Sequence, residues 1–420
     1  MKLPHPFRVR SVGGKRSEKG FSQTQLACVS RHKVSRFSVL FIMNYKTWIE
    51  ISGDNLHHNI NQFRACVGGA VKVAAVVKSN AYGHGLVEVA KAVEEQADFF
   101  GVDSVDEAIS LRRAEIGKPI LILGYTMLTR LAEVVENGFH QVVSGFETLE
   151  ALAKIASANK PALVHLKIET GTSRQGIWSA NLLKFLEFIK ANPQIQLAGM
   201  STHFANVEDT TDHSYARAQL RTFKEVVAIA EGSGFKHFIK HTACSAAALV
   251  FPEARFDMIR LGISLYGLWS SDATKVSARQ IGLTNFVLKP CLTWKTRIAQ
   301  IKDLPAGTNV GYGCTEKVNV STKIAILPVG YWDGYDRGLS SVGNVLICGQ
   351  RCRVLGRVCM NMTIVDVSHV EHVQLEDEVV LLGQQGREEI TAEELARKCQ
   401  TINYEVVTRI NPLIKRVIRG

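Results

Sequence analysis

A repeating pattern of short apolar runs and amphipathic segments between residues 71 and 285 constrains the fold more than any other feature. The apolar runs have the length and the β-branched composition of strands that are buried on both faces. The eight strand candidates are 71–78, 99–103, 119–124, 140–144, 162–169, 196–203, 237–244 and 257–261. Segments of helical periodicity stand between them, for example 105–114 and 216–230. The pattern predicts an α/β barrel of the TIM type, (β/α)8.

A doubly wound open sheet is the competing α/β architecture. It would be favoured by a GxGxxG turn after an early strand, and the sequence has none. We therefore favour the barrel.

After residue 285 the sequence changes to short β-rich runs broken by Gly, Pro or Asp, such as 324–329 and 378–383. One good helix is predicted there, over 392–398, with Thr391 as its N-cap and Glu394 completing a capping box. We predict a mainly β C-terminal domain over 286–420, which follows a barrel over 43–285.

The net charge of +11 is concentrated at the start of the chain. Residues 1–42 carry nine basic residues and one acid, a net +8, which leaves +3 for the remaining 378 residues. A nearly neutral body without a basic stripe argues against nucleic-acid binding. No apolar run approaches the length of a membrane span, so we expect no membrane association.

Residues 1–42 are rich in Arg, Lys and Ser and lack helical periodicity. This composition fits an organelle transit segment, a disordered basic tail, or a reading frame begun too far upstream. We favour a start near Met43, where structured-looking sequence begins. The nine cysteines include no CxxC pair and no histidine cluster at zinc spacing, so we expect reduced thiols, a cytoplasmic compartment and no metal site.

Lys78 ends a continuous apolar run, 73–77, and glycine-rich sequence follows it. A lysine at the exit of a buried strand is partly desolvated, which favours the neutral amine needed for carbonyl chemistry. We therefore consider Lys78 a candidate Schiff-base lysine. The alternative is an inert lysine whose stem packs on the strand end while its amine reaches water.

Further polar residues stand at the other predicted strand ends, where barrels carry their catalytic groups. They are Lys167, Glu169, Arg174, His203, Cys244, Ser245, Arg260, Gly262 and Ile263. Singly, each has an inert explanation, such as a surface cation or a core histidine. Together they suggest a phosphorylated aldehyde held by a lysine. Ser245, at the start of a helix-forming run, and the backbone N–H groups of Gly262 and Ile263 would bind the phosphate.

At these residues the chain resembles the pyridoxal-phosphate-dependent alanine racemases, which are fold type III enzymes. The resemblance covers residues 43–420, and its motifs occur in the family's order. They are 77–85, 165–176, 201–205, 241–247, 258–267, 311–315, 330–335, 357–363 and 401–405. It implies a cytoplasmic homodimer that binds pyridoxal 5'-phosphate and converts L-alanine to D-alanine, chiefly for peptidoglycan.

The resemblance implies that two bases act on opposite faces of the substrate. Lys78 matches the internal-aldimine lysine and one base, and Tyr312 matches the other base, which the partner subunit's second domain supplies. A phenol is a weak base at neutral pH, so Tyr312 needs help, for which Arg174, His203 and Arg260 are candidates. Arg260 would face the pyridine nitrogen. Because arginine keeps its proton, the ring would be a weaker electron sink, which favours proton exchange over transamination.

The remaining family positions concern the cofactor phosphate and the substrate. Tyr82, Ser245, Gly262, Ile263 and Tyr404 match phosphate-contacting positions, and His203 is a further cofactor-site candidate. Arg174 and the Met360 backbone N–H match the groups that hold the substrate carboxylate, and Tyr331 matches a tyrosine at the entrance. Lys167 matches a position that is often a carbamylated lysine.

Three positions depart from the family pattern: Cys244 replaces an asparagine, Asn361 an aspartate and Ser79 an alanine. None removes a reacting group, although Asn361 removes a charge and Cys244 could weaken cofactor retention. Two alternatives stay open, a racemase with broader substrate choice, such as serine or lysine, and a non-catalytic protein that binds pyridoxal phosphate. A non-catalytic binding protein would need neither Tyr312 nor the C-terminal domain.

Overall fold

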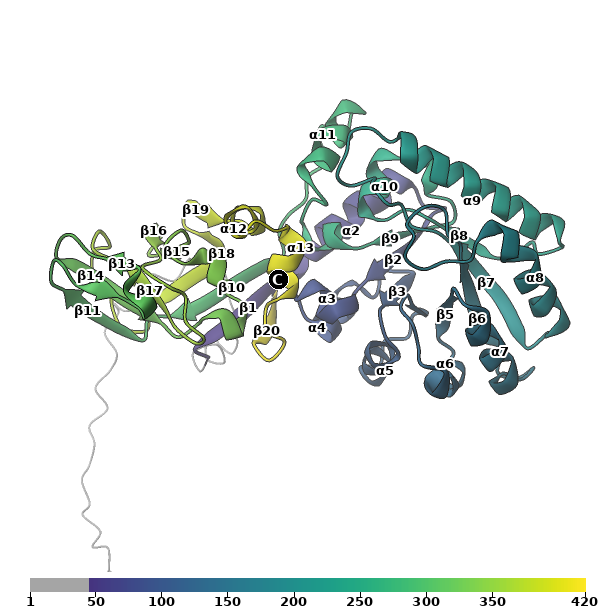
Figure 1. The fold of residues 1–420 in the computed structure, drawn as a ribbon, viewed down its shortest axis with the longest axis horizontal. Helices are drawn as coiled ribbons and strands as arrows, with labels where there is room; N and C mark the ends of the chain where they lie inside the picture. The colour runs from purple at the N-terminus through teal and green to yellow at the C-terminus, as the bar shows by residue number, and fades with distance from the viewer. Residues whose placement is uncertain (1–44) are drawn as a thin grey trace, which may run out of the picture. The chain divides into compact units, whose positions relative to one another are not determined.

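The computed structural model describes residues 45–420. The hypotheses about residues 1–42 and about a start at Met43 lie outside the described residues. Within 45–420 the chain forms a barrel of parallel strands and a mainly β region (Figure 1).

The barrel contains eight parallel strands, which confirms the predicted (β/α)8 fold. They are β2 (Lys72–Val76), β3 (Phe99–Val102), β4 (Ile120–Ile122), β5 (His140–Val143), β6 (Ala162–Lys167), β7 (Ile195–Ser201), β8 (Ile239–His241) and β9 (Met258–Leu261). Strand β9 pairs with β2. The N–H groups of Asp257 and Arg260 bond to the carbonyls of Lys240 and Ala243, and these bonds close the ring between β8 and β9.

Helices pack around the outside of this ring, as Figure 1 shows for α5 to α9. The helices of this part are α2 (Gly53–Val67), α4 (Leu86–Val93), α5 (Val105–Arg113), α6 (Leu131–Glu136), α7 (Phe146–Ile155), α8 (Leu182–Ala191), α9 (Ser214–Gly232), α10 (Ser245–Val250) and α11 (Asp272–Gln280). Helix α2 was not predicted, although its buried Leu56, Ile60, Phe63 and Val67 have helical spacing and Ser52 caps it.

Apolar side chains and imidazoles share the interior of the barrel. Ala74, Phe99, Leu121, Val142 and Met258 form one buried cluster there. The fully buried ring of His165 lies against Gly199, where a Cβ atom would come within 2.2 Å of the imidazole. Only glycine therefore leaves room for this ring, which sequence periodicity alone did not reveal.

The second region is mainly β, as predicted, and its main sheet has the strand order β16-β15-β18-β10-β1-β20. Strand β1 (Thr47–Ser52) lies between β10 (Leu292–Arg297) and β20 (Lys415–Arg419). The predicted assignment of 43–285 to the barrel is therefore wrong at its start, because β1 belongs to the second sheet. Its partners lie more than two hundred residues away in the sequence, and local patterns carry no information about such pairing.

The other strands of this region surround that core. They are β11 (Gln300–Leu304), β12 (Asn309–Val310), β13 (Glu316–Lys317), β14 (Thr322–Leu327), β15 (Asn344–Ile347), β16 (Gln350–Arg353), β17 (Thr363–Asp366), β18 (Glu378–Gln385) and β19 (Glu388–Ile390). Helix α12 (Ala392–Cys399) begins at Thr391, whose hydroxyl accepts the N–H of Glu394 at 3.1 Å. The Glu394 carboxylate pairs with Arg351 and Lys398. Helix α13 (Asn403–Thr408) was not predicted.

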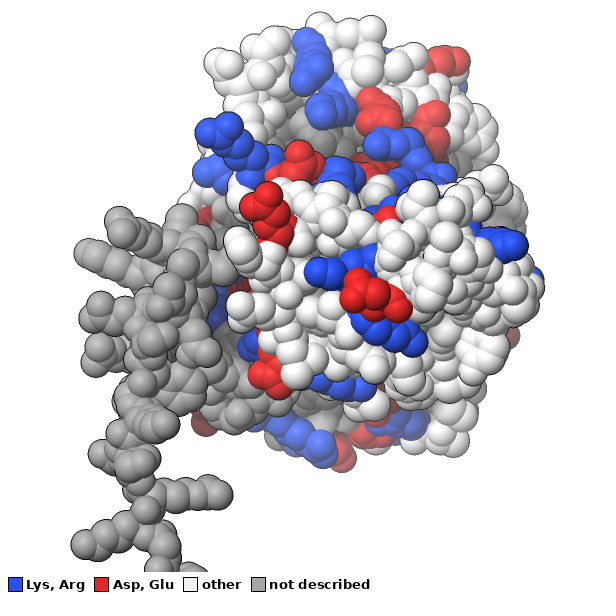
Figure 2. Space-filling view, turned by 90° about the vertical axis from the view of Figure 1, so that its left-hand side faces the viewer, with Lys and Arg blue, Asp and Glu red and all other residues white. Residues whose placement is uncertain are grey.

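Charges of both signs are interspersed on the face that Figure 2 shows, with uncharged surface between them. No continuous basic area is visible on this face. Between residues 45 and 420, no helix combines the length and the apolarity needed to cross a bilayer.

Candidate active site

The carboxyl ends of the barrel strands surround a cavity of about 620 Å³. Eleven of the residues singled out from the sequence line it: Lys78, Tyr82, Lys167, Arg174, His203, Cys244, Ser245, Arg260, Gly262, Ile263 and Tyr404. Ten come from the barrel part of the chain, and Tyr404 comes from α13. The structure therefore brings most of the predicted site together.

Lys78 begins a short segment, α3 (Lys78–Tyr82), whose backbone is left-handed after the lysine. Ser79, Asn80, Ala81 and Tyr82 all have φ between 52° and 55°. A left-handed conformation costs a residue with a Cβ roughly 1–2 kcal/mol, so this turn needs external support. The apolar run before Lys78 predicted the strand but gave no sign of the turn.

Glu107 of α5 supplies part of that support. Its carboxylate accepts the backbone N–H groups of Ser79 at 2.6 Å, Asn80 at 3.4 Å and Asp103 at 2.8 Å. One side chain thus joins the turn after β2 to the end of β3. Glu107 was not singled out from the sequence, because nothing in its helix pattern distinguishes it from a solvated acid.

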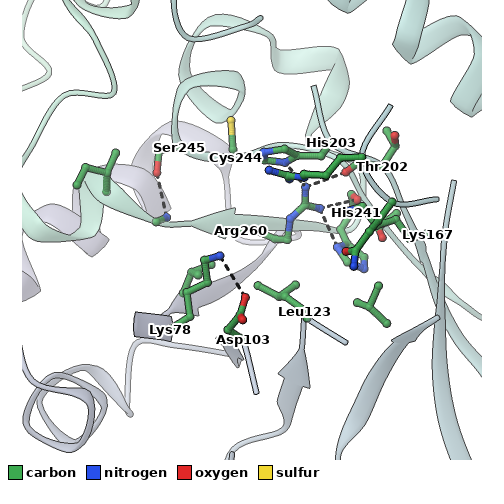
Figure 3. Close-up of a pocket in the computed structure, with 18 of the residues that line it drawn as sticks. Lys78, Asp103, Leu123, Lys167, Thr202, His203, His241, Cys244, Ser245 and Arg260 are labelled. Atoms are coloured by element: carbon green, nitrogen blue, oxygen red, sulfur yellow. Dashed lines mark hydrogen bonds and ion pairs between the residues drawn. The ribbon is translucent and has the colours of Figure 1, made fainter. Parts of the chain in front are cut away.

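The amine of Lys78 points toward Asp103 at the end of β3 (Figure 3), and the two form an ion pair of 3.3 Å. The side chains are 37% and 55% exposed. Lys78 is therefore partly desolvated, as the sequence predicted, and a carboxylate that was not predicted stands beside the amine.

Arg260 lies buried on the far side of the cavity, where its guanidinium donates to three backbone carbonyls, those of His241, Thr202 and Thr242. It also faces the Nδ1 atoms of His241 at 2.9 Å and His203 at 3.3 Å (Figure 3). Burial lowers the pKa of Arg260 to about 10, so it stays protonated at neutral pH. The guanidinium is a fixed donor whose orientation is set by five acceptors.

Three histidines continue from Arg260 into the barrel. His241 Nε2 lies 2.8 Å from His165 Nδ1, and His165 Nε2 lies 3.0 Å from His140 Nδ1. Arg260 can only donate, so His241 Nδ1 accepts and each ring then donates its Nε2–H to the next. Burial lowers the pKa of His140 to about 4, and the pKa values of His165 and His241 are also lowered, mainly by burial. These three imidazoles are therefore all neutral at pH 7.

His203 shares this environment. Burial, followed by the charge of Arg260, lowers its pKa to about 3. It is therefore a neutral imidazole at pH 7, and its Nδ1 atom is an acceptor for Arg260. A neutral His203 offers hydrogen bonding in the cavity but no positive charge.

The Ser245 end of the cavity has the form of an anion cradle. The Ser245 hydroxyl accepts the N–H of Gly262 at 2.9 Å, and α10 begins at this serine as predicted. A Cβ on residue 262 would come within 2.9 Å of the Tyr82 hydroxyl, so glycine allows this close approach. The buried hydroxyl of Ser264 has no protein partner among the described residues. The hydroxyls of Ser245 and Tyr82 line the cavity beside the Gly262 backbone, and hydroxyl donors suit a phosphate group.

Glu208, which was not predicted, occupies the same end. It accepts the Tyr404 hydroxyl at 3.1 Å and the Cys244 thiol at 3.4 Å. Burial raises the pKa of Glu208 and raises that of Cys244 to about 12, where Glu208 adds to the effect. Cys244 is thus an unreactive thiol that donates to a half-buried carboxylate.

Lys167 lies half-buried near the mouth of the cavity, between other cations. Burial first, and then the charges of Arg260 and Arg174, lower its pKa to about 8. Arg174 itself is exposed. Glu169 lies outside the cavity lining and accepts the N–H groups of Gly171 and Thr172.

Besides Glu169, three predicted residues do not line this cavity. Tyr312, Met360 and Tyr331 belong to the second region and are 72%, 55% and 43% exposed. Tyr331 and Met360 lie together, because the N–H groups of Tyr331 and Trp332 bond to the carbonyls of Cys359 and Met360. Tyr331 and Met360 are therefore neighbours outside the cavity lining, and Tyr312 is exposed in the same mainly β region.

Comparisons with known proteins match nearly all of the described chain. Residues 51–270 match the family model for the N-terminal domain of alanine racemase, and residues 291–418 match that for its C-terminal domain. The alanine racemase of Leptospira interrogans is 42% identical over 377 residues, which cover 89% of this chain and 96% of that protein. The alanine racemase of Halothermothrix orenii is 39% identical over 372 residues, 88% of this chain and 96% of that protein.

Solved structures give the same result. The crystal structure of an alanine racemase from D-cycloserine-producing Streptomyces lavendulae has a TM-score of 0.82 at 35% identity, covering 89% of this chain and 97% of that one. The Bacillus anthracis alanine racemase with bound L-Ala-P has a TM-score of 0.82 at 33% identity, covering 89% and 95%.

Proposed function

This chain belongs to the alanine racemase family, and we propose that it interconverts L- and D-alanine by a two-base mechanism with pyridoxal 5'-phosphate. Racemase activity follows from the family, whereas the residue roles are proposals. One observation supports these roles: a single cavity at the strand ends is lined by Lys78, Arg260 and the Ser245–Gly262 cradle.

The chemistry of the side chains that line the cavity supports binding of the cofactor. Lys78 would attach the aldehyde carbon, and Tyr82, Ser245, Gly262 and Ile263 would surround the phosphate. Tyr404 would join them by exchanging Glu208 for a phosphate oxygen as its acceptor. Arg260 would face the ring nitrogen as a fixed donor, oriented by its carbonyls and by His203 and His241. When bound, the cofactor withdraws electrons from the substrate α-carbon and so acidifies its proton.

Racemisation needs one group to remove the α-proton and another to return a proton on the opposite face. Lys78 Nζ would serve one face from the cavity wall. Tyr312 would serve the other face, and its exposure outside the cavity supports its entry into the cavity of a second copy of the chain. Tyr331 and Met360 are exposed in the same region, which supports a homodimer with a shared active site.

The substrate carboxylate would bind at the mouth of the cavity. Arg174 is exposed there and carries the charge, and the partner's Met360 would add its backbone N–H while Tyr331 lines the entrance. Lys167 would position Arg174 as a carbamate. Its pKa of about 8 leaves a fraction of neutral amine, which adds to the carbon of carbon dioxide and loses a proton to become an anion.

We place the reaction in the cytoplasm, with D-alanine supplied chiefly to peptidoglycan. Seven cysteines of the described residues are free thiols, which supports a reducing compartment: Cys66, Cys244, Cys291, Cys314, Cys352, Cys359 and Cys399.

The test is a racemisation panel with purified protein, covering alanine, serine, lysine and other amino acids. We expect alanine to be racemised with the highest kcat/KM. Equal rates for serine or lysine would favour the broader racemase, and cofactor binding without any turnover would favour the non-catalytic alternative.

A further inference from the structure

Asp103 is the feature of the cavity that the proposed mechanism does not use. The charged residues that line the cavity are four cations and two carboxylates: Lys78, Lys167, Arg174, Arg260, Asp103 and Glu208. Glu208 is already bonded to Tyr404 and Cys244. Asp103 instead faces the reactive amine, with 3.3 Å between its Oδ1 atom and Lys78 Nζ (Figure 3).

The contacts of Asp103 hold it beside the Lys78 amine. Its backbone N–H bonds to Glu107, the same carboxylate that holds the N–H of Ser79 beside Lys78. Across from it lies Gly124, where a Cβ would come within 2.3 Å of the Asp103 carbonyl and 3.1 Å of its Oδ2 atom. Glycine at this position therefore leaves the space that the aspartate occupies.

The chemistry of the site explains what such a carboxylate can do. The amine of an amino acid substrate must take the position that the Lys78 nitrogen occupied. In neutral water this amine is an ammonium ion. Arg174 and Arg260 attract its carboxylate but repel that ammonium. Asp103 is the cavity carboxylate positioned to offset this repulsion at the lysine.

We propose that Asp103 is the counter-ion for the amine that is exchanged in this site. It pairs with the Lys78 ammonium while the lysine is free, and it receives the α-ammonium of the substrate when the cofactor occupies the lysine. One ammonium replaces another, so the charge beside Asp103 is conserved. The ligand class is a primary α-ammonium, and the proposal rests on the proposed racemase function.

The first test compares alanine with propionate, which has the carboxylate but lacks the ammonium. In the loaded full-length enzyme, Asp103→Asn is expected to raise KM for alanine about two- to fivefold, the strength of a partly exposed ion pair. Inhibition by propionate should be unchanged or tighter. Asp106→Asn is the control, because Asp106 lies three residues further on, in the first turn of α5, and pairs with Arg130 outside the cavity lining. An unchanged KM for alanine, or an equal weakening of alanine and propionate binding, would contradict the role of Asp103 in binding the substrate ammonium.

The second test needs no turnover. After removal of the cofactor, the rate at which pyridoxal phosphate attaches to the protein is followed by absorbance. Asp103→Asn should accelerate attachment about two- to fivefold, because the ammonium form of the lysine loses its counter-ion. Asp106→Asn should match the wild type, and Asp103→Ala should repeat the acceleration. An unchanged or slower rate overturns the pairing with Lys78. If the wild type racemises no amino acid, the proposed function is wrong. The rate of pyridoxal phosphate attachment then tests the role of Asp103 by itself.

Discussion

At the scale of single residues, the local backbone and two carboxylates determine the setting of Lys78. The left-handed turn over residues 79–82 fixes the direction in which the chain leaves β2. Glu107 holds that turn by accepting its N–H groups, and Asp103 faces the amine. The sequence predicted a reactive lysine here but neither carboxylate, because acids at the start of a helix usually only face solvent.

The two proposed bases can be tested singly. We expect Lys78→Ala to abolish covalent cofactor attachment and racemisation. Tyr312→Phe should retain the attached cofactor and lose about 10²- to 10⁴-fold in kcat, the usual contribution of a proton-transferring group. Absorbance spectra and α-proton exchange in deuterated water would separate the two effects. A Tyr312→Phe protein that racemises at the wild-type rate would contradict the two-base assignment.

At the scale of elements, the C-terminal segments support the lysine turn. The carbonyl of Gly83 accepts two bonds from the buried guanidinium of Arg416 in β20. On its other side, a Cβ at Gly83 would come within 1.9 Å of the Val407 carbonyl in α13. The C-terminal elements α13 and β20 therefore pack directly against the turn that follows Lys78.

Gly83→Ala tests this packing. Its φ of 85° costs an alanine about 1 kcal/mol, and the overlap with Val407 should raise the total destabilisation to about 3 kcal/mol or more. Gly138→Ala is the matched control, because Gly138 has φ 62° but nothing within 4 Å of its Cβ position. Urea unfolding measures both variants. Equal losses of stability would show that backbone conformation alone matters and that the contact with α13 does not.

At the scale of the whole molecule, the exposed residues Tyr312, Tyr331 and Met360 of the second region lie outside the lining of the barrel cavity. The proposed mechanism joins them only between two copies. Mixing inactive Lys78→Ala and Tyr312→Phe proteins, followed by subunit exchange, should restore up to about a quarter of the wild-type activity, because half of the dimers are hybrids with one intact site in two. Activity that stays absent, while exchange is shown by tagged subunits, would contradict a shared site.

The buried histidines predict a pH dependence of stability. The pKa values of His84 and His140 are lowered to about 4 and that of His203 to about 3, chiefly by burial. Between about pH 6.5 and pH 4, the unfolded chain binds protons at these residues and the folded chain does not. The free energy of unfolding should therefore fall as the pH falls through this window, and be unaffected by these groups above it.

His140→Gln should reduce that slope by about 1.4 kcal/mol per pH unit, the value for one proton. Urea unfolding at a series of pH values measures it. His237→Gln is the control, since His237 is exposed. An unchanged slope for His140→Gln would show that His140 does not stay neutral in the folded protein.

The sequence by itself determined the barrel, the mainly β second region and most of the cavity lining. Apolar runs of strand length define the strands, and parallel strands of a barrel bring their carboxyl ends to one face, so Lys78, His203 and Arg260 had to meet. Only the tertiary structure decided the pairing of β1 with β10 and β20, the left-handed turn, and the contacts of Asp103 and Glu208. The physical reason is the sequence separation between contacting residues. Hydrophobic periodicity indicates only which face of a helix or strand is buried. Partners such as Gly83 and Arg416, 333 residues apart, are selected by packing in three dimensions.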